Sequence, residues 1–232
     1  MADKPAIVLV HGFWGGAAHW AGVILELQRR GYTDIHAVEN PLTSLQNDAA
    51  RTQQMVKQID GPVLLVGHSY GGEVITEAGD LPNVVGLVYV AAFAPDAGES
   101  AGQISQEHPP AAFSNIAPDS DGYLWIAQDK FKESFAQDLS DEDAFAMAVT
   151  QKAPVGSTFG DTVSAPAWKV KPVWYQVSTQ DRMIDPDNER RMAARMNPRK
   201  TIELDASHAS LASQPAAIVD LIDTAVADLA AE

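Results

Sequence analysis

Residues 63–72 read VLLVGHSYGG, an aliphatic run that leads directly into a serine flanked by glycines. The run Val63 to Val66 predicts a buried strand, and Gly71 to Ala78 has the spacing of a helix. A serine on a tight strand-to-helix turn is strained, and glycines two positions before and after it avoid collisions with neighbouring chain. The five-residue pattern alone also fits a plain turn. After a strand it favours a nucleophile elbow that exposes the hydroxyl of Ser69.

Strand-like and helix-like segments alternate along most of the chain. Six runs rich in Val, Ile and Leu predict strands buried on both faces: Ala6 to Val10, Ile35 to Val38, Val63 to Val66, Val84 to Val90, Val173 to Val177 and Thr201 to Leu204. Helical spacing occurs in Ala17 to Arg30, Leu45 to Ile59 with a Ser44 cap, Gly71 to Ala78, Asp187 to Met196 and Pro215 to Leu229. The alternation predicts an α/β fold: a mostly parallel sheet of about six strands, flanked by helices, with chemistry at the carboxyl ends of the strands.

One long stretch interrupts this alternation. Residues 98–166 carry several prolines and glycines and two polar helix-like pieces, Gly122 to Leu139 and Asp141 to Gln151. Long insertions between two strands are usually lids or mobile excursions. We therefore expect one domain over residues 1–232 with a helical, lid-like insertion at about 98–166. Its aromatic residues either line a pocket or only anchor the insertion: Phe113, Tyr123, Trp125, Phe131, Phe135 and Phe145.

The composition limits the classes of partner. The 232 residues are 46% hydrophobic and carry a formal charge of -15 without a Lys/Arg cluster, so we expect no nucleic acid and no membrane partner. The acidity serves solubility or disfavours anionic substrates. The absence of cysteine excludes disulfides and thiolate metal sites and fits a reducing compartment. The apolar run near Met1 is too short for a signal peptide, so we expect a cytoplasmic protein. The sequence does not decide whether the protein forms a homodimer.

A second glycine-rich turn follows the first strand, where residues 10–16 read VHGFWGG. Hydrolases with a nucleophile elbow place one oxyanion donor here, so the N–H groups of Phe13 and Tyr70 are the expected pair. Gly12 lets the backbone approach a substrate closely, and His11 is expected to hydrogen-bond within the loop. A glycine-rich turn can also cradle phosphate, but neither the P-loop ending nor the dinucleotide spacing is present.

The acid and the base follow later strands. Residues 178–186 read STQDRMIDP, and Asp181 is expected to accept the imidazole N–H of the catalytic histidine. Asp185 is expected to cap the next helix instead, and Asp96 is a remote alternative. His208 lies in the loop after the last strand and completes the order Ser, Asp, His. The other histidines are expected to be structural or at the surface: His19, His36, His68 and His108.

With these motifs in place, the chain resembles the α/β-hydrolase superfamily over essentially its whole length. It is similar to the compact branch of small-ester carboxylesterases, plant methyl-ester esterases and hydroxynitrile lyases, whose glycine pair and tryptophan match Gly15, Gly16 and Trp20. The resemblance implies a catalytic triad of Ser69, Asp181 and His208, with Phe13 and Tyr70 as oxyanion donors.

The resemblance also narrows the activity. Cyanohydrin-cleaving relatives carry a threonine at the position of Gly12 and a lysine where this chain has Ala209, whereas the esterases resemble this chain at both positions. Phe13 replaces the small residue usual in the branch, and this change bears on the size of the acyl group that the site accepts.

We expect a serine hydrolase that cleaves carboxylic esters of small to medium apolar substrates through an acyl-enzyme on Ser69. Gly12, Trp14 and Trp125 are the candidate pocket residues, and neither a cofactor nor a metal is needed. Activity should fall as the pH drops through about 6 to 7, the usual titration range of histidine. Alternatives on this fold are a lyase, a carbon–carbon hydrolase, a perhydrolase, an amidase or a non-catalytic small-ligand-binding protein.

Overall fold

The computed structural model describes residues 4–231 and is built around a six-stranded sheet in the order β2-β1-β3-β4-β7-β8. Every pairing in this sheet is parallel. The strands are β1 (Ala6–Val10), β2 (Ile35–Val38), β3 (Val63–His68), β4 (Val84–Val90), β7 (Val173–Ser178) and β8 (Lys200–Leu204). The predicted parallel sheet of about six strands is confirmed.

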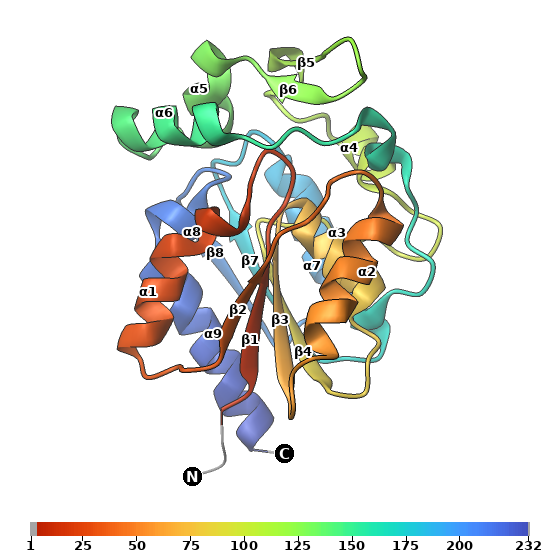
Figure 1. The fold of residues 1–232 in the computed structure, drawn as a ribbon, viewed down its shortest axis with the longest axis vertical. Coiled ribbons are helices and arrows are strands. Elements are labelled where there is room, and N and C mark those ends of the chain that lie inside the picture. The colour runs from red at the N-terminus through yellow and green to blue at the C-terminus, as the bar shows by residue number, and fades with distance from the viewer. Residues whose placement is uncertain (1–3, 232) are drawn as a thin grey trace.

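Helices cover both faces of the sheet (Figure 1). One layer contains α1 (Ala21–Arg29), α8 (Ser210–Ser213) and α9 (Pro215–Ala230), and the other contains α2 (Leu45–Val56), α3 (Tyr70–Ala78) and α7 (Pro186–Met196). Successive side chains of a strand point to opposite faces, so Ile7 and Leu9 pack in one core while Val8 and Val10 pack in the other. Only the inner strands are buried on both faces. The edge strands β2 and β8 are partly exposed, which corrects the expectation for them.

Local sequence fixes several element boundaries. The Ser44 side chain accepts a hydrogen bond from Asn47 N–H and begins α2 as predicted. Asp185 caps α7 in the same way, and Pro186 occupies the first turn, where its missing N–H has no cost. The helix ends at Met196, because the next residue, Asn197, has a left-handed backbone that stops further helical turns.

The chain between β4 and β7 forms a layer beyond the carboxyl ends of the strands (Figure 1). It contains α4 (Ala101–Glu107), β5 (Ile116–Pro118), β6 (Leu124–Ile126), α5 (Phe131–Phe135) and α6 (Asp141–Thr150). The helical piece predicted at Asp141 to Gln151 corresponds to α6. The prediction of a helix over Gly122 to Leu139 is wrong for most of that range, where only α5 is an α-helix. The Asp119 carboxylate accepts hydrogen bonds from the N–H groups of Asp121 and Tyr123, and this turn pairs β6 with β5 in a small hairpin.

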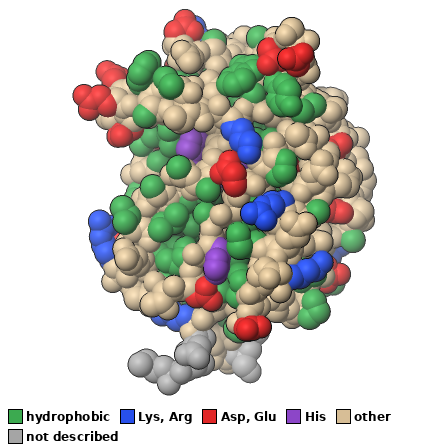
Figure 2. Space-filling model, in the orientation of Figure 1, with side chains coloured by type: hydrophobic (Ala, Val, Ile, Leu, Met, Phe, Trp, Pro, Cys, Tyr) green, Lys and Arg blue, Asp and Glu red, His purple; other side chains and the backbone are tan. Residues whose placement is uncertain are grey.

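Figure 2 shows acidic side chains scattered over the visible face and interspersed with basic ones. Large exposed apolar side chains are concentrated in the segment between β4 and β7, where Phe113, Trp125, Phe145 and Val149 lie. Among residues 4–231, no helix combines the length and the apolar character needed to cross a bilayer.

Candidate active site

Ser69 occupies a strained turn between β3 and α3. Its backbone has φ 56° and ψ -128°, a combination that residues other than glycine rarely adopt. The turn is crowded, because a Cβ on Gly67 would lie 2.5 Å from Gly71 O and a Cβ on Gly71 would lie 2.2 Å from Val10 O. The two flanking glycines are therefore required by close backbone approach, as the sequence pattern predicts.

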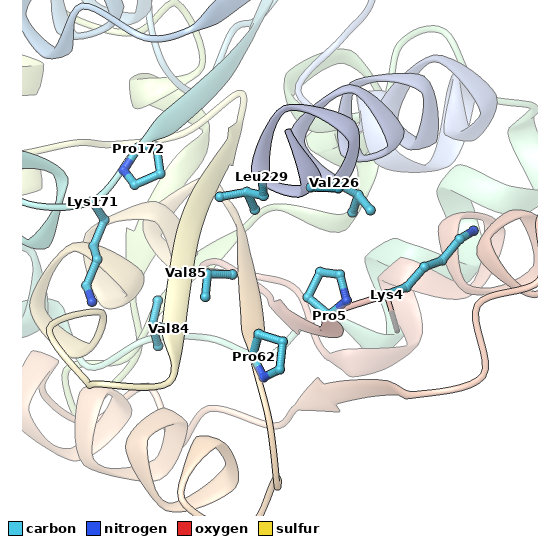
Figure 3. Close-up of a pocket in the computed structure, with 10 residues that line it drawn as sticks. Lys4, Pro5, Pro62, Val84, Val85, Lys171, Pro172, Val226 and Leu229 are labelled. Carbon is cyan, nitrogen blue, oxygen red and sulfur yellow. The ribbon is translucent and has the colours of Figure 1, made fainter. Parts of the chain in front are cut away.

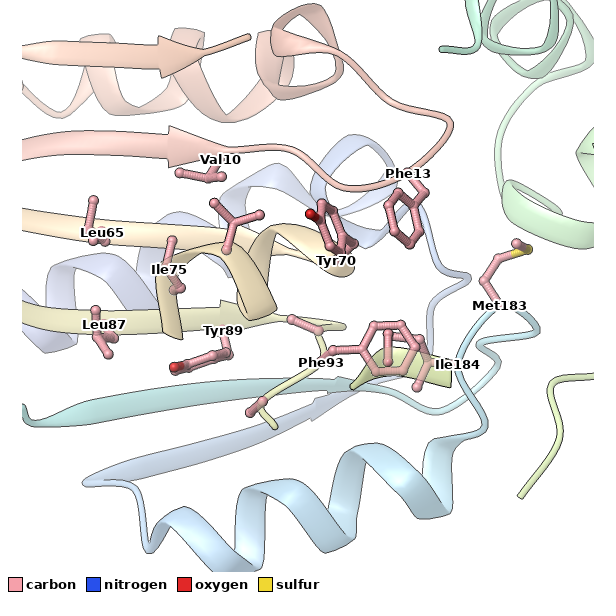
Figure 4. Close-up of a cluster of buried hydrophobic side chains, with 14 of the residues drawn as sticks. Val10, Phe13, Leu65, Tyr70, Ile75, Leu87, Tyr89, Phe93, Met183 and Ile184 are labelled. Carbon is pink, nitrogen blue, oxygen red and sulfur yellow. The ribbon is translucent and has the colours of Figure 1, made fainter. Parts of the chain in front are cut away.

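The loop after β1 packs directly against this turn. A Cβ on Gly12 would lie 2.6 Å from Ser69 Cβ and 2.9 Å from Tyr70 N. Tyr70 is the first residue of α3, so its N–H has no intrahelical acceptor. The rings of Phe13 and Tyr70 stack with centroids 3.9 Å apart and 12° between their planes (Figure 4). The structure thus brings together Gly12, Phe13, Ser69 and Tyr70.

His208 and Asp181 form a buried pair at the carboxyl ends of β8 and β7. His208 Nδ1 lies 2.5 Å from Asp181 Oδ2, and neither side chain has exposed surface. Asp181 Oδ1 accepts hydrogen bonds from the N–H groups of Met183 (2.7 Å) and Ile184 (2.9 Å). These donors fix the orientation of the carboxylate. His208 Nε2 is buried and has no hydrogen-bond partner within residues 4–231, so this nitrogen is free to accept a proton.

His68 links the histidine loop to the serine turn. Its Nε2 donates to His208 O over 2.7 Å, and the centroids of the two imidazole rings are 4.7 Å apart. Burial holds the pKa of His68 well below its usual value, so this ring is neutral. His208 therefore lies against the residue that precedes Ser69. From the insertion, the Phe135 ring packs edge-on to His208 with a centroid distance of 4.8 Å.

Two further histidines are buried nearby. His11 Nδ1 donates to Gly12 O and Nε2 accepts from Asn40 N–H, each over 2.9 Å, so this ring holds the loop as expected. Burial lowers the pKa of His11 and lowers that of His19 to about 4. Both rings are neutral near pH 7, which leaves His208 as the candidate base next to the serine turn.

Asp48 supports the site from α2, a role that sequence reasoning missed. Its Oδ2 accepts a hydrogen bond from Tyr70 OH and its Oδ1 accepts one from Leu42 N–H, each over 2.8 Å. Burial raises the pKa of Asp48 to about 6. Because Phe13 stacks on Tyr70, this carboxyl group holds both rings in place.

The two tryptophans proposed for the pocket lie in different environments. Trp14 is buried, and its Nε1 donates to Leu124 O over 2.8 Å. Trp125 is 41% exposed, and its Nε1 donates to Asp119 Oδ2 over 2.9 Å. The turn at Asp119 holds the Trp125 ring at the surface, and Trp125 is not among the residues that line the apolar cavity of the insertion, so its pocket role stays a prediction.

An apolar cavity of about 520 Å³ lies in the segment between β4 and β7. Its lining includes Pro110, Phe113, Ile116, Leu124 and Phe159. The Phe159 ring centroid is 4.5 Å from that of Phe13, so this side chain separates the cavity from the loop beside the serine turn. Phe159 was not singled out in the sequence, because it lies in an irregular segment without periodicity.

A second cavity, of about 420 Å³, lies at the opposite end of the sheet (Figure 3). It is lined by residues at the starts of the strands, among them Pro5, Pro62, Val84 and Pro172. The candidate catalytic residues follow the carboxyl ends of the strands, so this cavity is remote from them.

His108, Asp185 and Asp187 present possible metal-ligand atoms within 4.8 Å of one another. The group lies at the surface, and the Asp185 carboxylate already caps α7. It is separate from the Ser69 and His208 site.

Comparisons with known proteins agree with this geometry. The model of the alpha/beta hydrolase family matches residues 7–221. The alpha/beta hydrolase nvfD of Aspergillus novofumigatus (strain IBT 16806) is 26% identical over 247 residues, covering 97% of this chain and 98% of that protein. A carbendazim hydrolyzing esterase of Nocardioides sp. (strain SG-4G) is 33% identical over 106 residues, covering 40% of this chain and 44% of that protein.

The fold also matches solved structures. The structure of a pyrethroid hydrolase from Sphingobium faniae JZ-2 superposes with a TM-score of 0.84 at 21% identity, covering 99% of this chain and all of that one. At that identity the likeness establishes the fold alone. Together with the family match over residues 7–221, these findings show that the chain belongs to the alpha/beta hydrolase family.

Proposed function

We propose that this protein is a serine carboxylesterase. Neutral His208 takes the proton of Ser69 as the hydroxyl attacks an ester carbonyl. The imidazolium then gives this proton to the leaving alkoxide, so that an alcohol departs from the tetrahedral intermediate and His208 is neutral again. Water, deprotonated by the same imidazole, then hydrolyses the acyl-enzyme on Ser69. The observation that carries the proposal is the strained Ser69 turn with the His208–Asp181 pair packed behind it.

In this mechanism the Asp181 carboxylate orients His208 and stabilises the imidazolium that forms. The N–H groups of Phe13 and Tyr70 stabilise the oxyanion, supported by the positive end of the α3 dipole. The contact of Gly12 with Ser69 and the stacking of Phe13 on Tyr70 support this assignment, because they fix one donor loop against the other.

The proposed substrates are esters with an apolar acid or alcohol. The apolar cavity beside Phe159 supports this class, and the acidic surface disfavours anionic esters. The Nocardioides relative is named as an esterase, which supports the same reaction class. Ser69 is only 3% exposed, and Phe135 contacts His208 from the insertion. We therefore assign residues 98–166 as a lid that moves to admit substrate.

Hydrolysis of a short and a long p-nitrophenyl ester tests the proposal. Ser69→Ala should lose about 10⁴–10⁶-fold in kcat, as expected for removal of a nucleophile that acts together with its base. Ser213→Ala, which changes a serine of α8, should match the wild type. A fluorophosphonate probe should add one label per chain to the wild type and none to Ser69→Ala. Equal hydrolysis by the wild type and Ser69→Ala, or labelling of both, would refute the mechanism.

A further inference from the structure

Glu189 is a fully buried acid directly behind the histidine–aspartate pair. It lies in the first turn of α7, and its Oε2 accepts a hydrogen bond from Ser178 N–H over 3.1 Å. Ser178 ends β7, three residues before Asp181. A buried glutamate is unusual, because removing a charged carboxylate from water is costly unless a cation pairs with it.

The group that meets Glu189 is another acid. The charge of Asp181 and a side-chain hydrogen bond to it both raise the pKa of Glu189, and such a bond between two carboxyl groups requires a proton on one of them. Asp181 already accepts hydrogen bonds from three donors, two backbone N–H groups and His208. Glu189 accepts from one backbone N–H, and its Oε1 meets no donor in the part of the chain that the structure describes. The proton therefore resides on Glu189.

The other charged or titratable groups near Glu189 agree with this assignment. Tyr175 faces it from β7, and burial holds the pKa of that phenol well above its usual value. Arg190, the next residue of α7, is turned outward and pairs with Glu203 and Asp187, so its charge lowers the pKa of Glu189 less than burial and Asp181 raise it. Burial, followed by the charge of Asp181, raises the pKa of Glu189 well above its usual value.

We propose that Glu189 is a positioning residue, a neutral carboxylic acid whose O–H donates to the Asp181 carboxylate and holds it toward His208 Nδ1. The role rests on the proposed function of Asp181 in the esterase mechanism. It leaves the buried site with a single anion, Asp181, instead of two adjacent anions that would repel each other and bind a proton.

Infrared spectroscopy tests the proton directly, without relying on activity. At about pH 7 the wild type should show the C=O band of a protonated carboxylic acid that is absent from Glu189→Gln. Other buried acids, such as Glu73, contribute equally to both spectra and cancel in the difference. Asp187→Asn is the matched control and should keep the band, because Asp187 lies two residues before Glu189 on the same helix and its side chain is exposed. An unchanged band in Glu189→Gln would overturn the proposal.

Esterase kinetics then test the positioning role. The amide of Glu189→Gln still donates, so kcat should stay within about threefold and the acid limb of the pH profile of kcat/KM should not move. Glu189→Leu removes the donor, so kcat should fall about ten- to hundredfold with little change in KM. The acid limb should then move to higher pH, because the Asp181 charge acts on the imidazolium without a competing donor.

Two kinetic results would overturn the proposal. An acid limb that moves to lower pH in Glu189→Gln would mean that the wild type carries a charge on Glu189. Unchanged kcat in folded Glu189→Leu would mean that the donor has no effect on catalysis. If Glu189→Leu does not fold, the infrared difference and the Glu189→Gln profile decide. If the protein hydrolyses no ester, the infrared result still tests the proton and separates the two failures.

Discussion

Replacing Gly12 with alanine tests how closely the loop after β1 must approach Ser69, the proposed nucleophile. The added Cβ would lie 2.6 Å from Ser69 Cβ, 2.8 Å from His68 O and 2.9 Å from Tyr70 N. Non-bonded carbon contacts are favourable only from about 3.5 Å. All three atoms belong to the backbone or the Cβ of the serine turn, so none can rotate away. The loop must therefore retreat by roughly 0.6 to 0.9 Å, the shortfall in those contacts.

The expected loss follows from that displacement. A retreat of this size withdraws the Phe13 N–H from the oxyanion, and removal of one such donor costs about 10²–10³ in kcat, or about 2.7–4 kcal/mol. A misplacement of about 1 Å costs a similar factor. We therefore expect Gly12→Ala to lose about 10²–10³-fold in kcat toward a p-nitrophenyl ester. Overpacking should lower the free energy of unfolding by about 1–3 kcal/mol, which most proteins survive.

Gly16→Ala is the matched control in the same loop. Its added Cβ would meet only the flexible Glu39 carboxylate, at 3.5 Å, and its extended backbone suits any residue. This variant should keep wild-type kcat. Measured kcat and melting temperature for both variants separate loop displacement from general instability. A Gly12→Ala protein with kcat within about threefold of the wild type would refute the steric reasoning.

Three further predictions use the same esterase and unfolding assays. Asp181→Asn should lower kcat about 10⁴-fold, because the amide favours the wrong histidine tautomer, whereas Asp185→Ala should keep activity and lose about 1 kcal/mol of stability with its helix cap. Burial raises the pKa of Asp48 to about 6, so the folded state binds the proton of this carboxyl group more tightly than the unfolded state does. The contribution of Asp48 to the free energy of unfolding should therefore be lost as the pH rises from about 4 through 6. The difference in free energy of unfolding between the wild type and Asp48→Asn should follow that pH course, and a constant difference would contradict it. Phe159→Ala should raise kcat/KM for long esters relative to short ones by opening the cavity wall, and an unchanged ratio would place the substrate elsewhere.

The sheet and the serine turn were predictable because their signals are local. A strand buried on both faces is a continuous aliphatic run, and β1, β3 and β4 each have one. The glycines around Ser69 are required by contacts within a few residues and with the end of β1. Ser44 and Asp185 cap helices through their own side chains, so the sequence identifies both.

The insertion was harder to predict because its structure depends on distant contacts. Strands β5 and β6 have three residues each and are stable only as a pair, so neither carries a periodic signal. The same limit applied to Phe159, whose position between the cavity and Phe13 is set by tertiary packing.

The two buried acids had a sequence signal that polarity concealed. Asp48 lies on the buried face of α2 with Leu45, Ala49, Thr52 and Val56, at helical spacing. Glu189 lies with Met192, Ala193 and Met196 on the buried face of α7. An acidic residue within an apolar stripe is buried when the stripe is. Asp48 and Glu189 therefore qualify as buried by position, although their residue type favours the surface.

The strained backbone of Ser69 has a consequence for engineering this protein. A non-glycine residue held in such a conformation costs about 1–3 kcal/mol, and glycine at the same place has no such cost. Heat resistance and turnover therefore favour different residues at position 69. A random library ranked only by survival at high temperature would enrich Ser69→Gly and similar inactive chains. Directed evolution of this protein must keep activity in every round of selection, because stability alone rewards the loss of Ser69, its proposed nucleophile.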